Sequence, residues 1–218
     1  MKHFINHEML ALNVTTFPVD PKIVSEFASR SELPGGYSTV KPGGWKSDIE
    51  WVSASEEQSF AVFQSAFDRL EIGERLAPYL DLQDEPRLYA GFLVVRRECR
   101  EPHFHVDWTG ANNDAFTLMT PVTPAREGFG LLYERLDGSV GDYGYRLGEA
   151  VAFGDNFRHS SKPIRSDEAL VLLCFEFGTD KMEHWPSIYR TVGKQVTHIR
   201  QPDGRFVRAH GKAATPVA

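Results

Sequence analysis

The sequence predicts a mainly β domain of roll or barrel type that follows a set of N-terminal helices. Between residues 88 and 177, short apolar segments alternate with turns rich in Gly, Pro, Asn and Asp. Before residue 85, apolar residues instead recur at steps of three and four, as on one face of a helix. A chain of 218 residues with 41% hydrophobic composition is long enough to form one domain with its own core.

The helical part begins with Asp20 followed by Pro21, the pattern of an N-cap residue and a proline in the first helical turn. Residues 53–58 open a second helix, and residues 74–82 form a third helical piece. The apolar stripe of the second helix consists of Phe60, Phe63, Phe67 and Leu70.

Six strands are expected in the β-rich part. Because no helix of 10–15 residues separates them, we expect antiparallel pairing in a closed or sandwich-like sheet. One domain is expected over residues 1–218, with 1–85 a mostly helical buttress, 86–180 the β-roll core and 181–218 a C-terminal extension with a possible hairpin turn at Asp203. The expected strands are 88–95, 102–108, 115–123, 130–136, 145–153 and 169–177.

Composition argues against several classes of protein. The net charge of -6 and the lack of a basic stripe argue against nucleic-acid binding. Neither Cys99 nor Cys174 lies in a Cys-x-x-Cys pair, so a thiolate zinc site is not expected. With no leader pattern and no apolar run of about 18 residues, we expect a cytoplasmic protein that does not enter a membrane.

The segment 102–110 carries the strongest chemical signal. If it is extended, its side chains alternate between two faces, so that His103, His105 and Asp107 share one face. The alternate residues are bulky and apolar and can pack into a core. An ionised carboxylate beside two imidazoles is costly to bury without a partner, and a divalent cation would be that partner.

A third ligand is expected at His159, 52 positions beyond Asp107 (159 − 107). That separation holds two or three strands with their turns, so a rolled sheet can return His159 to the side of His105. Two histidines and one carboxylate on one side of a metal leave positions open, as in the facial triads that bind iron(II).

These residues give the region from Tyr89 to Gly178 a resemblance to the core of the iron(II)/2-oxoglutarate-dependent oxygenases. The matching pieces are 105–107, 148–153 leading to His159, and the strand 169–177. The resemblance implies a double-stranded β-helix, the jelly-roll fold shared with cupins, and iron(II) held by His105, Asp107 and His159. It also implies 2-oxoglutarate as cosubstrate, O2, and hydroxylation of an unactivated C–H bond of a small molecule.

One expected feature of the family is missing. Many members have an Arg about ten residues after the distal histidine, which binds the far carboxylate of 2-oxoglutarate. No Arg occurs there, so Arg165 is the first candidate for this role, Lys162 the second and Arg97 the third.

Further residues near the segment 102–110 or on neighbouring strands are candidates for binding the cosubstrate or the substrate. The remaining cosubstrate candidates are Tyr89, Thr117 and Ser161, and the substrate candidates are His103, Trp108, Asn112, Asn113 and Arg97.

Two other functions stay open at this point. His103 and His105 form the His-x-His pair used by cupins, which indicates a metal-dependent dioxygenase or isomerase without 2-oxoglutarate. The Glu that usually follows such a pair is replaced here by Thr109 and Gly110. The second alternative is a non-catalytic β-roll binding module.

Overall fold

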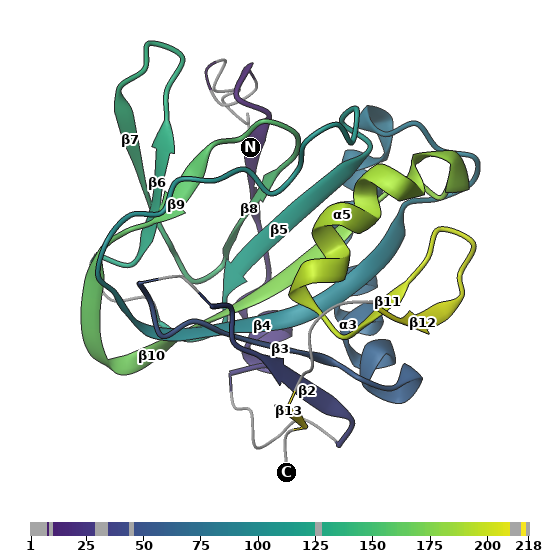
Figure 1. Cartoon of the computed structure of the whole chain (residues 1–218), viewed down its shortest axis with the longest axis horizontal. Coiled ribbons are helices and arrows are strands. Elements are labelled where there is room, and N and C mark those ends of the chain that lie inside the picture. Colours follow the sequence, from purple (N-terminus) through teal and green to yellow (C-terminus); the bar gives the residue numbers. More distant parts are fainter. Residues whose placement is uncertain are drawn as a thin grey trace.

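The computed structural model describes residues 8, 11–28, 35–43, 46–124, 128–209 and 215–216. Its main feature is a curved antiparallel sheet, the major sheet (Figure 1). In spatial order, its strands are β1 (Val14–Pro18), β8 (Glu149–Phe153), β5 (Ala115–Pro121), β10 (Ile164–Gly178), β4 (Arg87–Cys99), β3 (Glu50–Ala54), β2 (Tyr37–Val40) and β13 (Thr215–Pro216).

A minor sheet faces the middle of the major one. It consists of β7 (Val140–Gly144), β6 (Gly130–Glu134) and β9 (His159–Ser161). A single β-bridge between His105 and His159 extends it beyond β9. Residues of both sheets, such as Leu131 and Leu172, belong to one buried cluster. The two sheets therefore form a jelly roll, and the mainly β roll expected from the sequence is confirmed.

Helix α3 (Glu57–Leu70) covers the outer face of the major sheet. Its predicted stripe is buried, and Phe67 packs on Phe175 of β10 with ring centroids 5.6 Å apart. A glycine permits this close packing, because a Cβ on Gly91 would lie 2.4 Å from Phe63. Two short helices flank α3, namely α2 (Pro21–Ser25), capped by Asp20 as predicted, and α4 (Ile72–Leu76).

Helix α5 (Trp185–Gln195) lies on the opposite side of the sheet from α3 (Figure 1). Its residues Ile188 and Val192 are fully buried in the cluster that lies between the sheets. The chain then forms a hairpin of β11 (His198–Arg200) and β12 (Phe206–Arg208), with Gly204 at φ +89° in its turn. The predicted hairpin turn at Asp203 is therefore present.

The structure differs from the sequence-based outline in two ways. Residues 1–85 contribute β1, β2 and β3 as well as helices, because these strands of four or five residues gain their stability from pairing with distant strands. Residues 102–108 form an irregular segment with one bridge at His105 rather than a regular strand. Within the described residues, no helix has the length and apolar character required to cross a membrane.

Candidate metal centre

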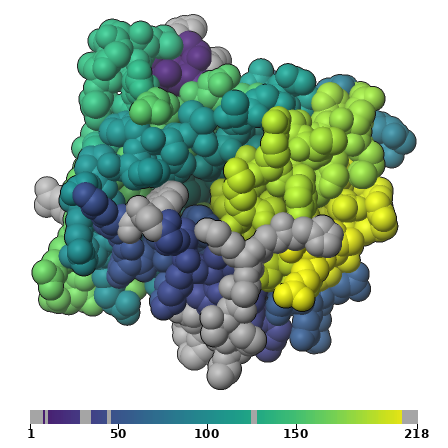
Figure 2. All heavy atoms as spheres, in the orientation of Figure 1, coloured from purple at the N-terminus to yellow at the C-terminus, as the bar shows by residue number. Residues whose placement is uncertain are grey.

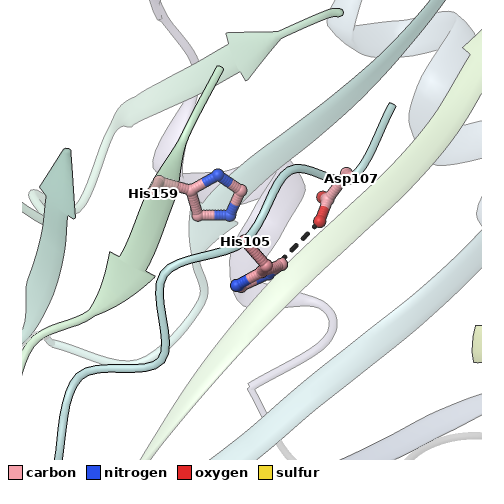
Figure 3. A group of neighbouring side chains, drawn as sticks. All are labelled: His105, Asp107 and His159. Atoms are coloured by element: carbon pink, nitrogen blue, oxygen red, sulfur yellow. Dashed lines mark ion pairs between the residues drawn. The ribbon is translucent and has the colours of Figure 1, made fainter. Parts of the chain in front are cut away.

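The predicted triad is assembled at the edge of the minor sheet. Figure 3 shows His105, Asp107 and His159 pointing toward one another. Each offers one ligand atom, and these atoms all lie within 4.8 Å of one another. Two backbone hydrogen bonds of 2.9 Å, one in each direction, join His105 to His159. These two candidate ligands are therefore 54 positions apart in sequence (159 − 105) but held together by one β-bridge.

Both imidazoles have their Nε2 atoms available for a cation. Nδ1 of His105 lies 2.8 Å from the carbonyl oxygen of His103, and Nδ1 of His159 lies 3.1 Å from that of Phe157. A carbonyl can only accept a hydrogen bond, so each Nδ1 carries the proton. Nε2 of His105 then faces Oδ1 of Asp107 at 3.4 Å. Two acceptor atoms at this distance require a cation between them, either a proton or a metal ion.

The second oxygen of Asp107 is held by a hydrogen-bond chain. The indole Nε1 of Trp108 donates to Oγ1 of Thr117 at 2.9 Å, and Thr117 donates to Oδ2 of Asp107 at 3.1 Å. An indole N–H can only donate, so the Thr117 oxygen accepts from it and directs its own hydrogen toward the carboxylate. Oδ2 is thereby occupied, and Oδ1 remains for a metal ion. Such partners of metal ligands fix their orientation.

The pKa values describe this centre in its metal-free form. Burial raises the pKa of Asp107, but the hydrogen bond from His105 and the nearby imidazoles outweigh burial and hold that pKa below its ordinary value. Burial lowers the pKa of His105, yet its bond with Asp107 outweighs this effect and raises the pKa overall. The pKa of His159 is lowered because the ring is fully buried. Asp107 is therefore ionised, and His159 is neutral, as metal ligands must be.

The triad forms part of the wall of a cavity of about 610 Å³ between the two sheets. Its floor is the inner face of the major sheet, where strand pairing places side chains in rows. One row contains Trp51, Val94 and Leu172, and the next contains Phe92, Cys174 and Met119. The cavity is thus largely apolar, with a few polar groups, which is typical of sites for small molecules.

Arg96 is the most unusual residue of the cavity wall. Arg96 is only 3% exposed, and its Nη1 donates a hydrogen bond to Oγ of Ser161. Within the described part of the chain, its Nε and Nη2 atoms are buried and have no hydrogen-bond partner. On β10, the residue paired with Arg96 is Leu170, 11 positions after His159 (170 − 159). Arg96 therefore lies across the strand pair from the place where the resemblance implied an Arg.

The three cations named from the sequence do not line the cavity in the described structure. Arg165 and Arg97 are exposed, and Lys162 forms an ion pair of 2.6 Å with Asp142. Arg97 and Arg96 are neighbours on one strand, so their side chains point to opposite faces. A signal was present in the sequence, because Arg96 continues the alternate apolar residues of β4 that face the core.

The remaining candidates divide between the cavity and other places. Thr117 and Ser161 line the cavity, whereas Tyr89 is fully buried outside it and donates to the carbonyl oxygen of Thr179 at 2.6 Å. Trp108 is fully buried outside the cavity lining, and its indole N–H donates a hydrogen bond to Thr117, which does line the cavity. His103 is exposed, with its ring centroid 5.9 Å from that of His105.

The Asn112–Asn113 pair forms an exposed turn, with φ of 54° and 62°. The side chain of Asn113 accepts a hydrogen bond of 2.9 Å from Asn13. Neither asparagine is among the described residues that line the cavity. The structure therefore gives both of them a role in the local backbone.

Helix α5 contributes to the cavity in a way that was not predicted from the sequence. Thr191, Gly193, Lys194 and Gln195, near the C-terminal end of this helix, form one side of the cavity. The Thr191 hydroxyl also donates to the backbone carbonyl of Asp107 at 2.5 Å. The helix therefore contacts both the cavity and the segment that carries two of the ligands.

Comparison with known proteins gives matches at the level of structure. No protein-family model and no curated protein matches this sequence. The non-heme alpha-ketoglutarate-dependent epimerase SnoN from nogalamycin biosynthesis has a TM-score of 0.61 at 12% identity, over 79% of this chain and 81% of its own. HygX from Streptomyces hygroscopicus, with nickel and 2-oxoglutarate bound, has a TM-score of 0.54 at 14% identity, over 81% and 88%.

An oxidoreductase of the 2OG-Fe(II) oxygenase family from Burkholderia pseudomallei has a TM-score of 0.58 at 11% identity, over 78% of this chain and 87% of its own. At these identities the similarity establishes the fold. The chain thus has the jelly-roll fold of 2-oxoglutarate/iron(II) oxygenase structures, together with a His-x-Asp…His group in it.

Proposed function

We propose that this protein is an iron(II)- and 2-oxoglutarate-dependent oxygenase that hydroxylates a C–H bond of a small molecule. In this proposal, His105, Asp107 and His159 bind the metal ion. The fold of the structural neighbours supports this assignment, as do the ligand atoms within 4.8 Å of one another.

The observation that carries the proposal is the buried guanidinium of Arg96. A buried charge with unpaired donors is costly, and a carboxylate with two oxygens removes that cost by accepting both N–H groups. Arg96 lines the same cavity as the three candidate ligands. A dicarboxylate such as 2-oxoglutarate fits this arrangement, because one end can reach the metal while the other end pairs with the arginine.

Two neighbours of Arg96 would complete the binding site for the far carboxylate. Ser161 already accepts a hydrogen bond from Arg96 and keeps its own hydroxyl hydrogen for a ligand. Burial raises the pKa of Tyr145, which also lines the cavity, so its phenol stays protonated and able to donate. The apolar floor around these groups would keep water from the cosubstrate.

The metal ion, when bound with 2-oxoglutarate and O2, would supply the oxidising power for R–H + 2-oxoglutarate + O2 → R–OH + succinate + CO2. The chain would contribute the positions of the ligands, the grip on the far carboxylate and an enclosed apolar space. A small substrate suits a cavity of about 610 Å³. HygX is also known with nickel, 2-oxoglutarate and hygromycin B bound.

A direct test is calorimetric titration of 2-oxoglutarate into protein loaded with nickel(II), which binds ligands without turnover. Arg96→Met should weaken 2-oxoglutarate binding by about 30-fold or more, because removing one partner of a buried charge pair costs about 2–5 kcal/mol. Arg97→Met is the matched control and should bind as the wild type does. Equal binding by the Arg96 variant and the wild type would contradict the proposal.

A further inference from the structure

The outer part of the cavity has a composition different from that of its inner end. Strand pairing places Val40, Trp51 and Val94 in one row across β2, β3 and β4, and all three line the cavity. They form an apolar surface, here called the platform. Val40 and Trp51 are partly exposed, whereas Arg96 at the inner end is buried. The platform is therefore the part of the cavity that an arriving molecule meets.

Helix α5 forms the side of the cavity that faces the platform. In Figure 2, the yellow-green surface of α5 and the blue surface of the β2–β3 segment lie on either side of the middle of the molecule. From α5, Lys194 and Gln195 reach the cavity together with Thr191. An apolar surface thus lies on one side, and hydrogen-bond donors lie on the other.

The positive charge on this side of the cavity is not neutralised. Lys194 is exposed and forms no ion pair within the described residues, and neither does Arg190, four positions earlier on α5. Like charges at this spacing repel each other on a helix. By contrast, Lys41 and Lys46, which flank the loop after β2, pair with carboxylates at 2.7 and 2.6 Å. The chain is acidic overall and yet leaves Lys194 unpaired.

Negative charge is nearly absent from the described cavity lining. Its one carboxylate there is Asp107, which the proposed function assigns to the metal. The inner end carries Arg96 and the outer end carries Lys194, so each end has its own cation. Two anions could therefore bind at once, one at each end, without sharing a partner.

We propose that the outer part of the cavity binds the substrate as a small amphipathic anion. Its apolar, ring-sized body lies on the platform, and its anionic group pairs with Lys194. The body then lies in the same cavity as the candidate metal ligands, while α5 holds the charged group. The inference rests on the proposed function, because it names the class of substrate for that reaction.

The test uses two probes of nearly the same shape, the anion 2-naphthoate and the neutral 2-naphthamide, with binding to the metal-free full-length protein measured by calorimetry. Lys194→Gln should weaken naphthoate binding about twofold to fivefold, because an ion pair open to water is worth up to about 1 kcal/mol, and should leave naphthamide binding unchanged. Trp51→Ala should weaken the binding of both probes. The matched control Lys22→Gln removes an exposed lysine of α2 outside the cavity and should change neither.

Three results would overturn the inference. The first is naphthoate binding that Arg96→Met abolishes and Lys194→Gln leaves intact, because the anion would then lie at the inner end. The second is an equal loss of both probes in Lys194→Gln, which would indicate a structural effect on α5. The third is a wild-type protein that binds neither probe. The assay needs no iron, 2-oxoglutarate or turnover, so a failure of the proposed function in the nickel titration leaves its outcome unaffected.

Discussion

Thr117 offers a sensitive test of how the candidate metal ligands are held. Its hydroxyl accepts from Trp108 at 2.9 Å and donates to Asp107 at 3.1 Å, and it is 3% exposed. Thr117→Val keeps the shape of the side chain and removes both hydrogen bonds. The variant leaves the indole N–H of Trp108 buried without a partner and frees Oδ2 of Asp107.

Thr117→Val should lower both the stability of the protein and its affinity for a metal ion. Losing a bond to a carboxylate costs about 1.5–3 kcal/mol, and an unsatisfied buried donor adds about 1–3 kcal/mol, so the free energy of unfolding should fall by at least about 2 kcal/mol. Loss of a partner that orients a metal ligand lowers metal affinity about 10- to 100-fold. We therefore expect the nickel(II) affinity of Thr117→Val to fall by at least about tenfold.

Thr120→Val is the matched control on the same strand. Thr120 is fully buried and donates one hydrogen bond of 3.0 Å to the carbonyl oxygen of Glu149, away from the triad. The Thr120→Val variant should lose about 1 kcal/mol of stability and keep its nickel affinity. Calorimetric nickel titration and urea unfolding of both variants provide the measurements. If Thr117→Val loses stability but binds nickel as the wild type does, the hydrogen-bond chain does not orient Asp107.

Two further variants test the buried carboxyl group of Glu176 and the close packing at Gly91. Glu176 is fully buried, both of its carboxylate oxygens lack a partner within the described structure, and burial raises its pKa well above the ordinary 4.5. The folded state thus holds a proton that the unfolded chain releases, so this group costs stability as pH rises above about 4.5. Glu176→Gln should therefore raise the melting temperature of the metal-free protein more at pH 8 than at pH 5. An equal gain at both pH values would contradict the assignment. In urea unfolding, Gly91→Ala should lose about 1–3 kcal/mol or more of unfolding free energy, because its Cβ would lie 2.4 Å from Phe63. The control Gly144→Ala, whose Cβ would have nothing within 4 Å, should lose far less. Equal losses would show that α3 can move away.

The parts of the fold that were predictable are those set by local patterns. The stripe of α3, the N-cap at Asp20 and the turn at Asp203 depend on residues within a few positions, and all three are present. Strands β1 and β3 pair with strands far along the chain, and β2 joins the sheet through β3, so their four or five residues carry little signal alone. Helix α5 was missed for a related reason, because its burial against the sheet supports a segment that contains Pro and Gly.

The candidate site divides in the same way. The sequence predicted that His105, Asp107 and His159 would lie together, because ligand type and spacing are properties of the sequence, and the structure brings the three side chains together. Arg96 was not identified, although the alternation along β4 places it on the core-facing side; its burial without a partner for Nε and Nη2 is seen only in the folded chain. Its neighbour Arg97 has the same chemistry and points to solvent. Which of two adjacent arginines faces the cavity depends on strand alternation, and the regular pairing from Phe92 to Arg96 puts Arg96 on the side of Phe92 and Val94.

The most direct test of the central claim is an anaerobic titration of the metal-free protein with iron(II) and then with 2-oxoglutarate, followed by visible absorption. If 2-oxoglutarate binds iron(II) in this cavity, a weak charge-transfer band should appear that needs both additions, is absent in His105→Ala, and requires far more 2-oxoglutarate in Arg96→Met than in Arg97→Met. Iron binding without such a band at saturating 2-oxoglutarate would contradict the claim that this cavity holds 2-oxoglutarate on the metal.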